Sequence, residues 1–148
     1  MNLFQFGRRR LPMIQQDSNG ECGLACLAMV GQWYGHRLDL TNLRSSYPTT
    51  RRGLSFANLA AVADHLRFDV RGYKVDDLSD LKRVRLPAIL HWSGNHFVVL
   101  KSVKRDRFVI HNPAVGVRTL TRADVEEACT GFVLEVQPSE AFRIIVKE

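Results

Sequence analysis

The chain has 148 residues, of which 45% are hydrophobic, and this predicts one domain with a sizeable core. Its formal net charge is +6, but the basic residues are scattered and do not alternate with aromatic residues, which argues against a nucleic-acid partner. No apolar run reaches the roughly 18 residues of a membrane-spanning helix, and three cysteines at no framework spacing indicate a reducing compartment.

The first half of the chain is predicted to be helical. A basic segment over residues 1–10 comes first, and Gly35 and the Pro48 region mark the later breaks. Ser55 is expected to begin a helix that runs to about Leu66. The apolar spacing predicts helices over residues 22–34, 40–44 and 55–66.

The second half is predicted to be mostly strands. Strands are expected over residues 68–73, 88–92, 97–103, 108–110, 117–120 and 132–136. Residues 78–81 form a short helical turn, and Thr121 caps a helix that runs to about Cys129. The polar residues 104–107 join two apolar runs and predict a β-hairpin. This order predicts an α+β fold with a helical lobe packed on an antiparallel sheet.

Cys22 is the candidate nucleophile. It follows a polar turn over residues 17–20 and opens the first predicted helix. The positive end of a helix dipole favours the thiolate form of a cysteine, and the upstream amide of Gln16 can donate a hydrogen bond to a developing oxyanion. A cysteine is otherwise most often a small buried hydrophobic residue, which is the role assigned to Cys26 and Cys129.

His96 and Asn112 are expected near the same end of the predicted hairpin, because one opens its first strand and the other closes its second. A group that hydrogen-bonds an imidazole fixes its tautomer and orientation, and cysteine, histidine and asparagine in this order are the arrangement of papain-like proteases. His111 is expected on the opposite face of the sheet and is assigned no catalytic role. No dense spacing of Cys and His supports a zinc site.

These motifs resemble the papain-like peptidase domain at the N-terminus of bacterial peptidase-containing ABC transporters, which export bacteriocins and peptide pheromones. The matching residues are Gln16, Cys22 to Leu27, His96 to Val99 and Asn112-Pro113. The family usually carries aspartate where this chain has Asn112. The asparagine lacks the negative charge that would stabilise an imidazolium.

The resemblance implies a papain-like cysteine peptidase fold over residues 11–137, followed by the start of a linker to a transmembrane domain over residues 138–148. It also implies the site residues, with Cys22 as nucleophile, His96 as general base and acid, Asn112 orienting His96, and Gln16 in the oxyanion hole. The implied substrate is the precursor of a bacteriocin or similar peptide, whose helical leader ends in Gly-Gly or Gly-Ala and is cut after that pair.

The resemblance further implies that the protein partners are the transmembrane and ATPase domains of the same transporter. The domain itself would need no cofactor, since ATP and magnesium would bind only to the ATPase domain. It would lie at the cytoplasmic face of the bacterial inner membrane, where basic residues are attracted to anionic lipid. Two alternatives stay open: a non-catalytic domain that docks leader or cargo peptides, and another papain-like hydrolase such as an amidase.

Overall fold

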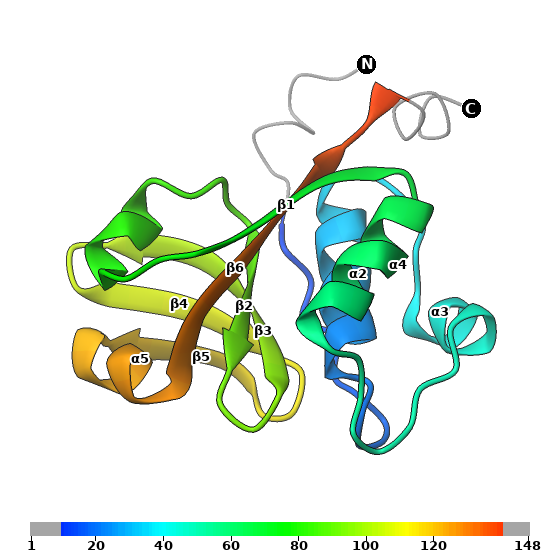
Figure 1. Ribbon diagram of the computed structural model, residues 1–148, viewed down its shortest axis with the longest axis horizontal. Coiled ribbons are helices and arrows are strands. Elements are labelled where there is room, and N and C mark those ends of the chain that lie inside the picture. Colours follow the sequence, from blue (N-terminus) through cyan, green and yellow to red (C-terminus); the bar gives the residue numbers. More distant parts are fainter. Residues whose placement is uncertain (1–9, 141–148) are drawn as a thin grey trace.

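In the described residues, three helices come first, and the strands follow with a 3-10 turn and one more helix between them (Figure 1). The computed structural model describes residues 10–140, so most of the predicted basic segment and linker lie outside the described residues. The helices are α2 (Cys22–Trp33), α3 (Leu40–Ser46), α4 (Phe56–His65) and α5 (Arg122–Ala128), with a 3-10 turn η1 (Leu78–Lys82). The strands are β1 (Phe68–Lys74), β2 (Ala88–Trp92), β3 (His96–Lys104), β4 (Arg107–Asn112), β5 (Gly116–Thr121) and β6 (Cys129–Pro138). The predicted α+β fold class is confirmed.

Local signals explain where the elements begin and end. Ser55 precedes α4 as its N-cap, and its hydroxyl accepts the N–H of Asn58 at 3.0 Å. Thr121 caps α5 in a reciprocal capping box with Asp124. Gly35 follows the end of α2 with a φ of +91°, a conformation that suits glycine.

The strands form one antiparallel sheet in the order β1-β6-β2-β3-β4-β5. Strand β6 is ten residues long, whereas the apolar run alone predicted residues 132–136. It is longer because its two ends pair with different neighbours. Pro138 lies opposite Phe68 of β1, and Cys129 lies opposite Trp92 of β2. The last strand in chain order is therefore inserted between the first two.

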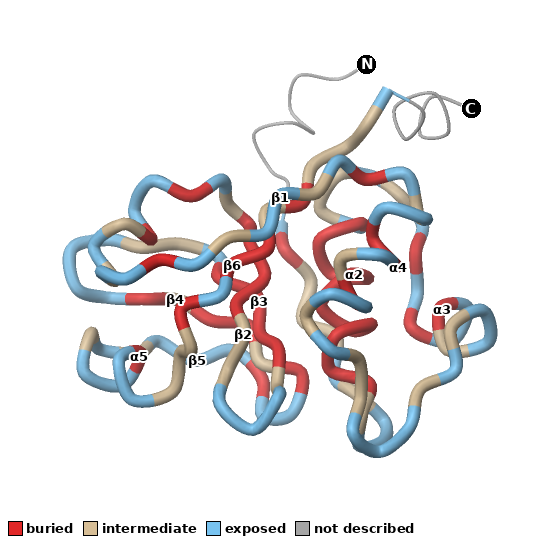
Figure 2. The backbone as a smooth tube through the Cα atoms, in the orientation of Figure 1, coloured by how far each residue is buried: buried red, intermediate tan, exposed pale blue. Residues whose placement is uncertain are grey.

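The central strands are buried on both faces (Figure 2). Ile89 and Phe97 face a cluster that contains the buried residues of α2 and α4. Leu90 and Val98, their neighbours along the strands, face a second cluster that includes residues of η1 and α5. Side chains alternate along a strand, so a strand covered on both faces reads as a continuous apolar run.

Helix α2 is the central element of the helical lobe, and it packs against β3. All residues from Cys22 to Gly31 are buried, and this stretch contains no charged side chain whose desolvation would oppose burial. A Cβ on Gly23 would lie 3.0 Å from Leu59 of α4 and 3.4 Å from Phe97 of β3. The first turn of α2 therefore lies in close contact with both α4 and β3. No helix in residues 10–140 is long and apolar enough to cross a membrane.

Candidate active site

The ends of three elements meet at the boundary between the helical lobe and the sheet. Cys22 is the first residue of α2, His96 the first of β3, and Asn112 the last of β4. The backbone N–H of Phe97 is near enough to the Cys22 sulfur to lower the pKa of its thiol, which places the thiol beside the start of β3. The side chains of His96 and Asn112 are hydrogen-bonded to each other. The structure thus brings together the three residues that the sequence analysis predicted to form a site.

The hydrogen bond between His96 and Asn112 determines the histidine tautomer. Oδ1 of Asn112 lies 2.8 Å from Nε2 of His96 and also accepts the backbone N–H of Ala114 at 2.9 Å. A backbone N–H can only donate, so the oxygen of the amide must be on this side. Nε2 of His96 therefore carries the hydrogen, and Nδ1 keeps its lone pair. An imidazole in this form can accept a proton from a thiol.

The environment of Cys22 differs from the sequence-based expectation. The helix N-terminus was expected to favour the thiolate, but burial raises the pKa of the Cys22 thiol above its ordinary value. The backbone N–H groups of Phe97, Gly23 and Cys22 act in the opposite direction and lower this pKa, without outweighing desolvation. In the free site, desolvation therefore outweighs the preference for thiolate that the helix N-terminus was expected to give.

Gln16 lies on the β4 side of the site. Its backbone N–H donates to the carbonyl of Pro113 at 3.0 Å, next to Asn112. Its Nε2 donates to the carbonyl of Ser18 at 3.3 Å, which uses one of the two amide hydrogens. Its Oε1 is buried and has no hydrogen-bond partner among residues 10–140. The side chain therefore has unused hydrogen-bonding capacity at the edge of the site.

His111 and Cys26, which were assigned no catalytic role, are both buried. His111 is buried, and its Nδ1 lies 2.9 Å from the carbonyl of Pro12, so it anchors the segment that leads to Gln16. Cys26 is fully buried, and burial raises its pKa well above the ordinary value for a thiol. Within the described part of the chain, no cluster of His, Cys, Asp and Glu could hold a metal ion.

Glu21 and Arg44 form an ion pair that sequence reasoning missed. The Glu21 side chain is only 3% exposed, accepts the N–H groups of Asp17 and Ser18 at 3.0 and 3.1 Å, and pairs with the Arg44 guanidinium. The hydrogen bond from Arg44 lowers the pKa of Glu21, although burial acts to raise it. Arg44 also contacts Asp17 at 2.8 Å. Together these contacts fix the turn that delivers Cys22.

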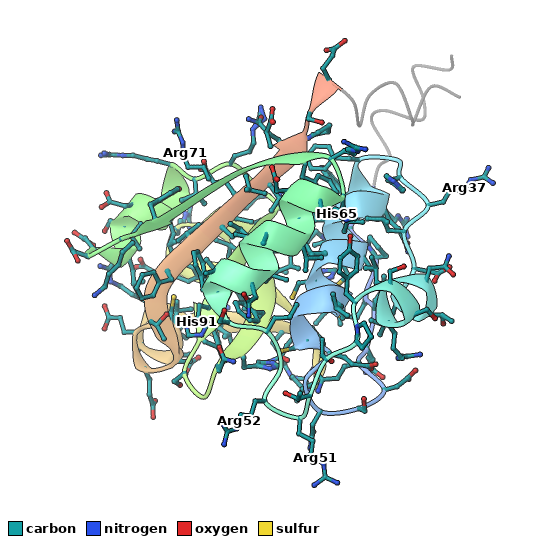
Figure 3. The ribbon with its side chains drawn as sticks, turned by 45° about the vertical axis from the view of Figure 1, so that its right-hand side comes forward. Arg37, Arg51, Arg52, His65, Arg71 and His91 are labelled. Atoms are coloured by element: carbon teal, nitrogen blue, oxygen red, sulfur yellow. The ribbon has the colours of Figure 1, made fainter. Side chains whose placement is uncertain are left out.

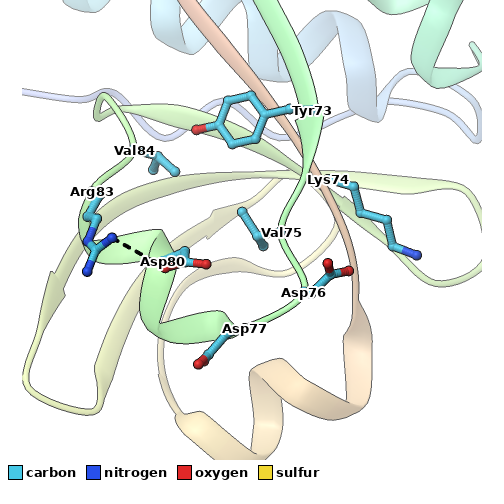
Figure 4. Close-up of a pocket in the computed structure, with 8 residues that line it drawn as sticks. All are labelled: Tyr73, Lys74, Val75, Asp76, Asp77, Asp80, Arg83 and Val84. Carbon is cyan, nitrogen blue, oxygen red and sulfur yellow. Dashed lines mark ion pairs between the residues drawn. The ribbon is translucent and has the colours of Figure 1, made fainter.

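A surface hollow near η1 shares no residue with this site (Figure 4). Of its three acidic residues, Asp80 pairs with Arg83 at 3.9 Å and Asp77 pairs with Arg122 at 3.1 Å, which leaves Asp76 as the third. It therefore offers no competing candidate for the chemistry.

Comparisons with a family model and with curated proteins indicate the same family. The model of the Peptidase C39 family matches residues 10–141. The colicin V secretion/processing ATP-binding protein CvaB of Escherichia coli is 41% identical over 136 residues, which cover 92% of this chain and 19% of that protein. The transport/processing ATP-binding protein ComA of Streptococcus pneumoniae is 33% identical over 147 residues, which cover 94% of this chain and 20% of that protein. The chain thus spans about a fifth of the length of these curated relatives.

Solved structures agree with this family. A double glycine motif protease from an AMS/PCAT transporter, crystallised with the leader peptide, has a TM-score of 0.81 and is 32% identical; the match covers 89% of this chain and 94% of that one. The peptidase domain of Streptococcus ComA has a TM-score of 0.79 at 22% identity and matches in its fold, over 88% of this chain and 100% of that one. The predicted papain-like fold and the resemblance to transporter peptidase domains are confirmed.

Replacing Glu21 by glutamine should reduce the pH dependence of stability. The pKa of Glu21 is lower in the folded state, so its carboxylate stabilises the fold above its unfolded pKa, and this contribution is lost as the pH falls through the folded pKa. The free energy of unfolding, measured with urea between about pH 6 and about pH 3, should therefore fall less in Glu21→Gln than in wild type.

Asp77→Asn is the matched control, because the pKa of Asp77 is also lowered, chiefly by the backbone N–H of Ser79, but Asp77 lies outside the site. In both variants the free energy of unfolding should fall less with pH than in wild type. Only Glu21→Gln should change the rate at which iodoacetamide alkylates Cys22. Equal alkylation rates in Glu21→Gln and wild type would show that the ion pair does not position the nucleophile.

Proposed function

We propose that this chain, which belongs to the peptidase C39 family, removes the leader from a bacteriocin or similar precursor peptide by cysteine endopeptidase chemistry. One observation carries the proposal: the His96–Asn112 pair, joined at 2.8 Å, lies beside the buried thiol of Cys22 at the boundary of the two lobes. The likeness to a double glycine motif protease that binds a leader peptide supports the choice of substrate.

The first chemical step is attack by Cys22 on the carbonyl carbon of the scissile peptide. Because burial keeps the thiol neutral, Nδ1 of His96 takes its proton as the carbon–sulfur bond forms. The carbonyl oxygen becomes an oxyanion, which accepts hydrogen bonds from the amide of Gln16 and the backbone N–H of Cys22. Asn112 fixes the ring through Nε2, which leaves Nδ1 as the nitrogen that can take the proton.

The second step breaks the peptide carbon–nitrogen bond. The protonated His96 gives its proton to the leaving amine, which departs as the new N-terminus of the mature peptide, and the leader remains as a thioester on Cys22. Water then attacks the thioester while His96 takes a proton from it. The thiolate leaves and regains that proton from His96, and the leader departs as a carboxylic acid that loses its remaining proton to solvent.

The leader is proposed to end in Gly-Gly or Gly-Ala. Residues with little or no side chain allow the substrate backbone to approach closely on both sides of its chain, which a buried thiol requires. The upstream part of the leader is proposed to bind as an amphipathic helix through its apolar face.

The proposed partners are the transmembrane and ATPase domains of the same transporter. The names of CvaB and ComA describe secretion or transport together with ATP binding, and both proteins are much longer than this chain. ATP and magnesium would then bind outside this chain. A place at the cytoplasmic face of the bacterial inner membrane suits the net charge of +6, because basic residues near a membrane are attracted to anionic lipid.

Cys22→Ala should abolish cleavage of a Gly-Gly leader peptide and leave its binding nearly intact, because the substitution removes only the nucleophilic sulfur. Cleavage is followed by mass spectrometry and binding by calorimetry. Cys26→Ala, one helical turn away, is the control and should keep catalysis despite a loss of packing. Wild-type turnover in Cys22→Ala would exclude the cysteine peptidase mechanism. Binding without cleavage by the wild type would instead favour a docking domain.

Gln16→Ala should lower kcat by about 10²–10³ with little change in KM, because an oxyanion donor acts in the transition state and not in the ground state. Gln15→Ala is the control, since this exposed neighbour has the same side chain. Steady-state kinetics on one leader peptide separates the two constants. A rise in KM with unchanged kcat would make Gln16 a substrate-binding residue.

Asn112→Asp should keep activity, because a carboxylate oxygen can accept the same hydrogen bond from Nε2 of His96. Its added negative charge stabilises the imidazolium, so the limb of the pH–rate profile that reports His96 should move to higher pH. Asn112→Ala leaves the ring free to rotate and should cost far more activity. If alanine matched wild type across the profile, Asn112 would be only a turn residue before Pro113.

A further inference from the structure

Asn95, the residue before His96, links the sheet to the loop between α3 and α4. Its Nδ2 lies 3.0 Å from the carbonyl of Arg52 and 3.1 Å from the carbonyl of Leu54. Its Oδ1 lies 3.0 Å from Nε2 of His91. The two carbonyls belong to the helical lobe, whereas Asn95 lies in the turn between β2 and β3. One side-chain amide therefore bridges the two lobes.

The donors and acceptors of this bridge can be assigned fully. The two carbonyls use both amide hydrogens of Asn95, so its oxygen faces His91, whose Nε2 must carry a hydrogen. Nδ1 of His91 then accepts the hydroxyl hydrogen of Thr130, 2.9 Å away. When His91 is doubly protonated, the Thr130 hydroxyl accepts from Nδ1 and donates to the carbonyl of His91 at 3.1 Å. The bridge thus persists in both protonation states.

The same loop, residues 50–54, also contacts the turn before Cys22. A Cβ on Gly20 would lie 2.0 Å from the carbonyl oxygen of Thr50, and Gly20 has a φ of +92°, so only glycine fits there. Figure 3 shows Arg51 and Arg52 extending outward from this loop. The loop backbone is therefore fixed two residues before Cys22 and, through Asn95, one residue before His96.

We propose that Asn95 is a positioning residue that fixes how far loop 50–54 stands from His96 and so limits the size of the substrate residues beside the scissile bond. This role rests on the proposed function. A peptide attacked by Cys22 and protonated by His96 must pass between the segments that carry them. Gln16 and Pro113 lie on the β4 side of these residues, and loop 50–54 contacts the segments just before them.

The size limit follows from how the loop is held. A methyl group on a substrate residue beside loop 50–54 would have to displace a backbone that Asn95 holds with two hydrogen bonds. Removing the Asn95 side chain frees the carbonyls of Arg52 and Leu54 and lets the loop move away from His96. Selectivity for glycine should then fall, while the hydrogen bond between His96 and Asn112 remains.

Asn95→Gly gives the sharpest test, because Asn95 has a φ of +55°, which glycine adopts more readily than asparagine. If Asn95 served only the turn, this variant would match wild type. We expect instead that the ratio of kcat/KM for a Gly-Gly leader peptide to that for its Ala-Ala analogue falls by about tenfold. Asn95→Asp keeps the acceptor for His91 but presents an oxygen to both loop carbonyls, and it should behave in the same way.

Arg105→Gly is the matched control, since Arg105 has a φ of +56° in the turn at the other end of β3. It should leave the selectivity ratio at the wild-type value. An unchanged ratio in both Asn95 variants would overturn the proposed role.

A second measurement does not depend on peptidase activity. The rate of Cys22 alkylation is compared for a small and a bulky maleimide, with peptide mapping to separate Cys22 from Cys26 and Cys129. The bulky-to-small ratio should rise in both Asn95 variants and stay unchanged in Arg105→Gly; an unchanged ratio in the Asn95 variants would overturn the inference. A wild type that cleaves no leader peptide but shows this pattern would reject the proposed function while supporting the role of Asn95 in access to Cys22.

Discussion

The burial of the first turn of α2 against β3 is the constraint on which the site depends. Gly23 lets this turn approach Leu59 and Phe97 so closely that a Cβ would be in tight contact with Leu59. The approach places the Cys22 sulfur at the backbone N–H of Phe97, one residue from His96. The same apolar contacts that form the core of the helical lobe therefore set the separation of nucleophile and base. A larger residue at position 23 would change both at once.

Close packing also affects the electrostatics of Cys22 and His96. Burial raises the pKa of Cys22, and the residue that orients His96 is a neutral amide rather than a carboxylate. Burial therefore disfavours the thiolate form of Cys22, and the amide adds no negative charge beside His96. The proton transfer is then coupled to attack on the substrate, which itself supplies polar groups to the site.

Local patterns in the sequence were sufficient for the elements and for the central residues of the site. The 3.6- and 2-residue periods, the caps at Ser55 and Thr121, and the turn over residues 104–107 are all set by neighbours in sequence. The full length of β6 was not predicted, because it depends on pairing with β1 and β2. Glu21 and Arg44 were missed for the same reason, since an ion pair across 23 positions leaves no periodic signal. The pKa of Cys22 was misjudged because the helix dipole is visible in sequence and the degree of burial is not.

The site residues share one structural property: each lies at the end of an element or in a connecting segment, and each is anchored by a different part of the fold. The turn before Cys22 is held by Arg44 of α3, the turn before His96 is held by the loop before α4, and Gln16 is held by Pro113 after β4. Loops alone would be too mobile to align a thiol, an imidazole and an amide. Because the anchors of His96 and Gln16 link the helical lobe to the sheet, the geometry of the site depends on the docking of the two. Packing of the two lobes is thus a condition for catalysis as well as for stability.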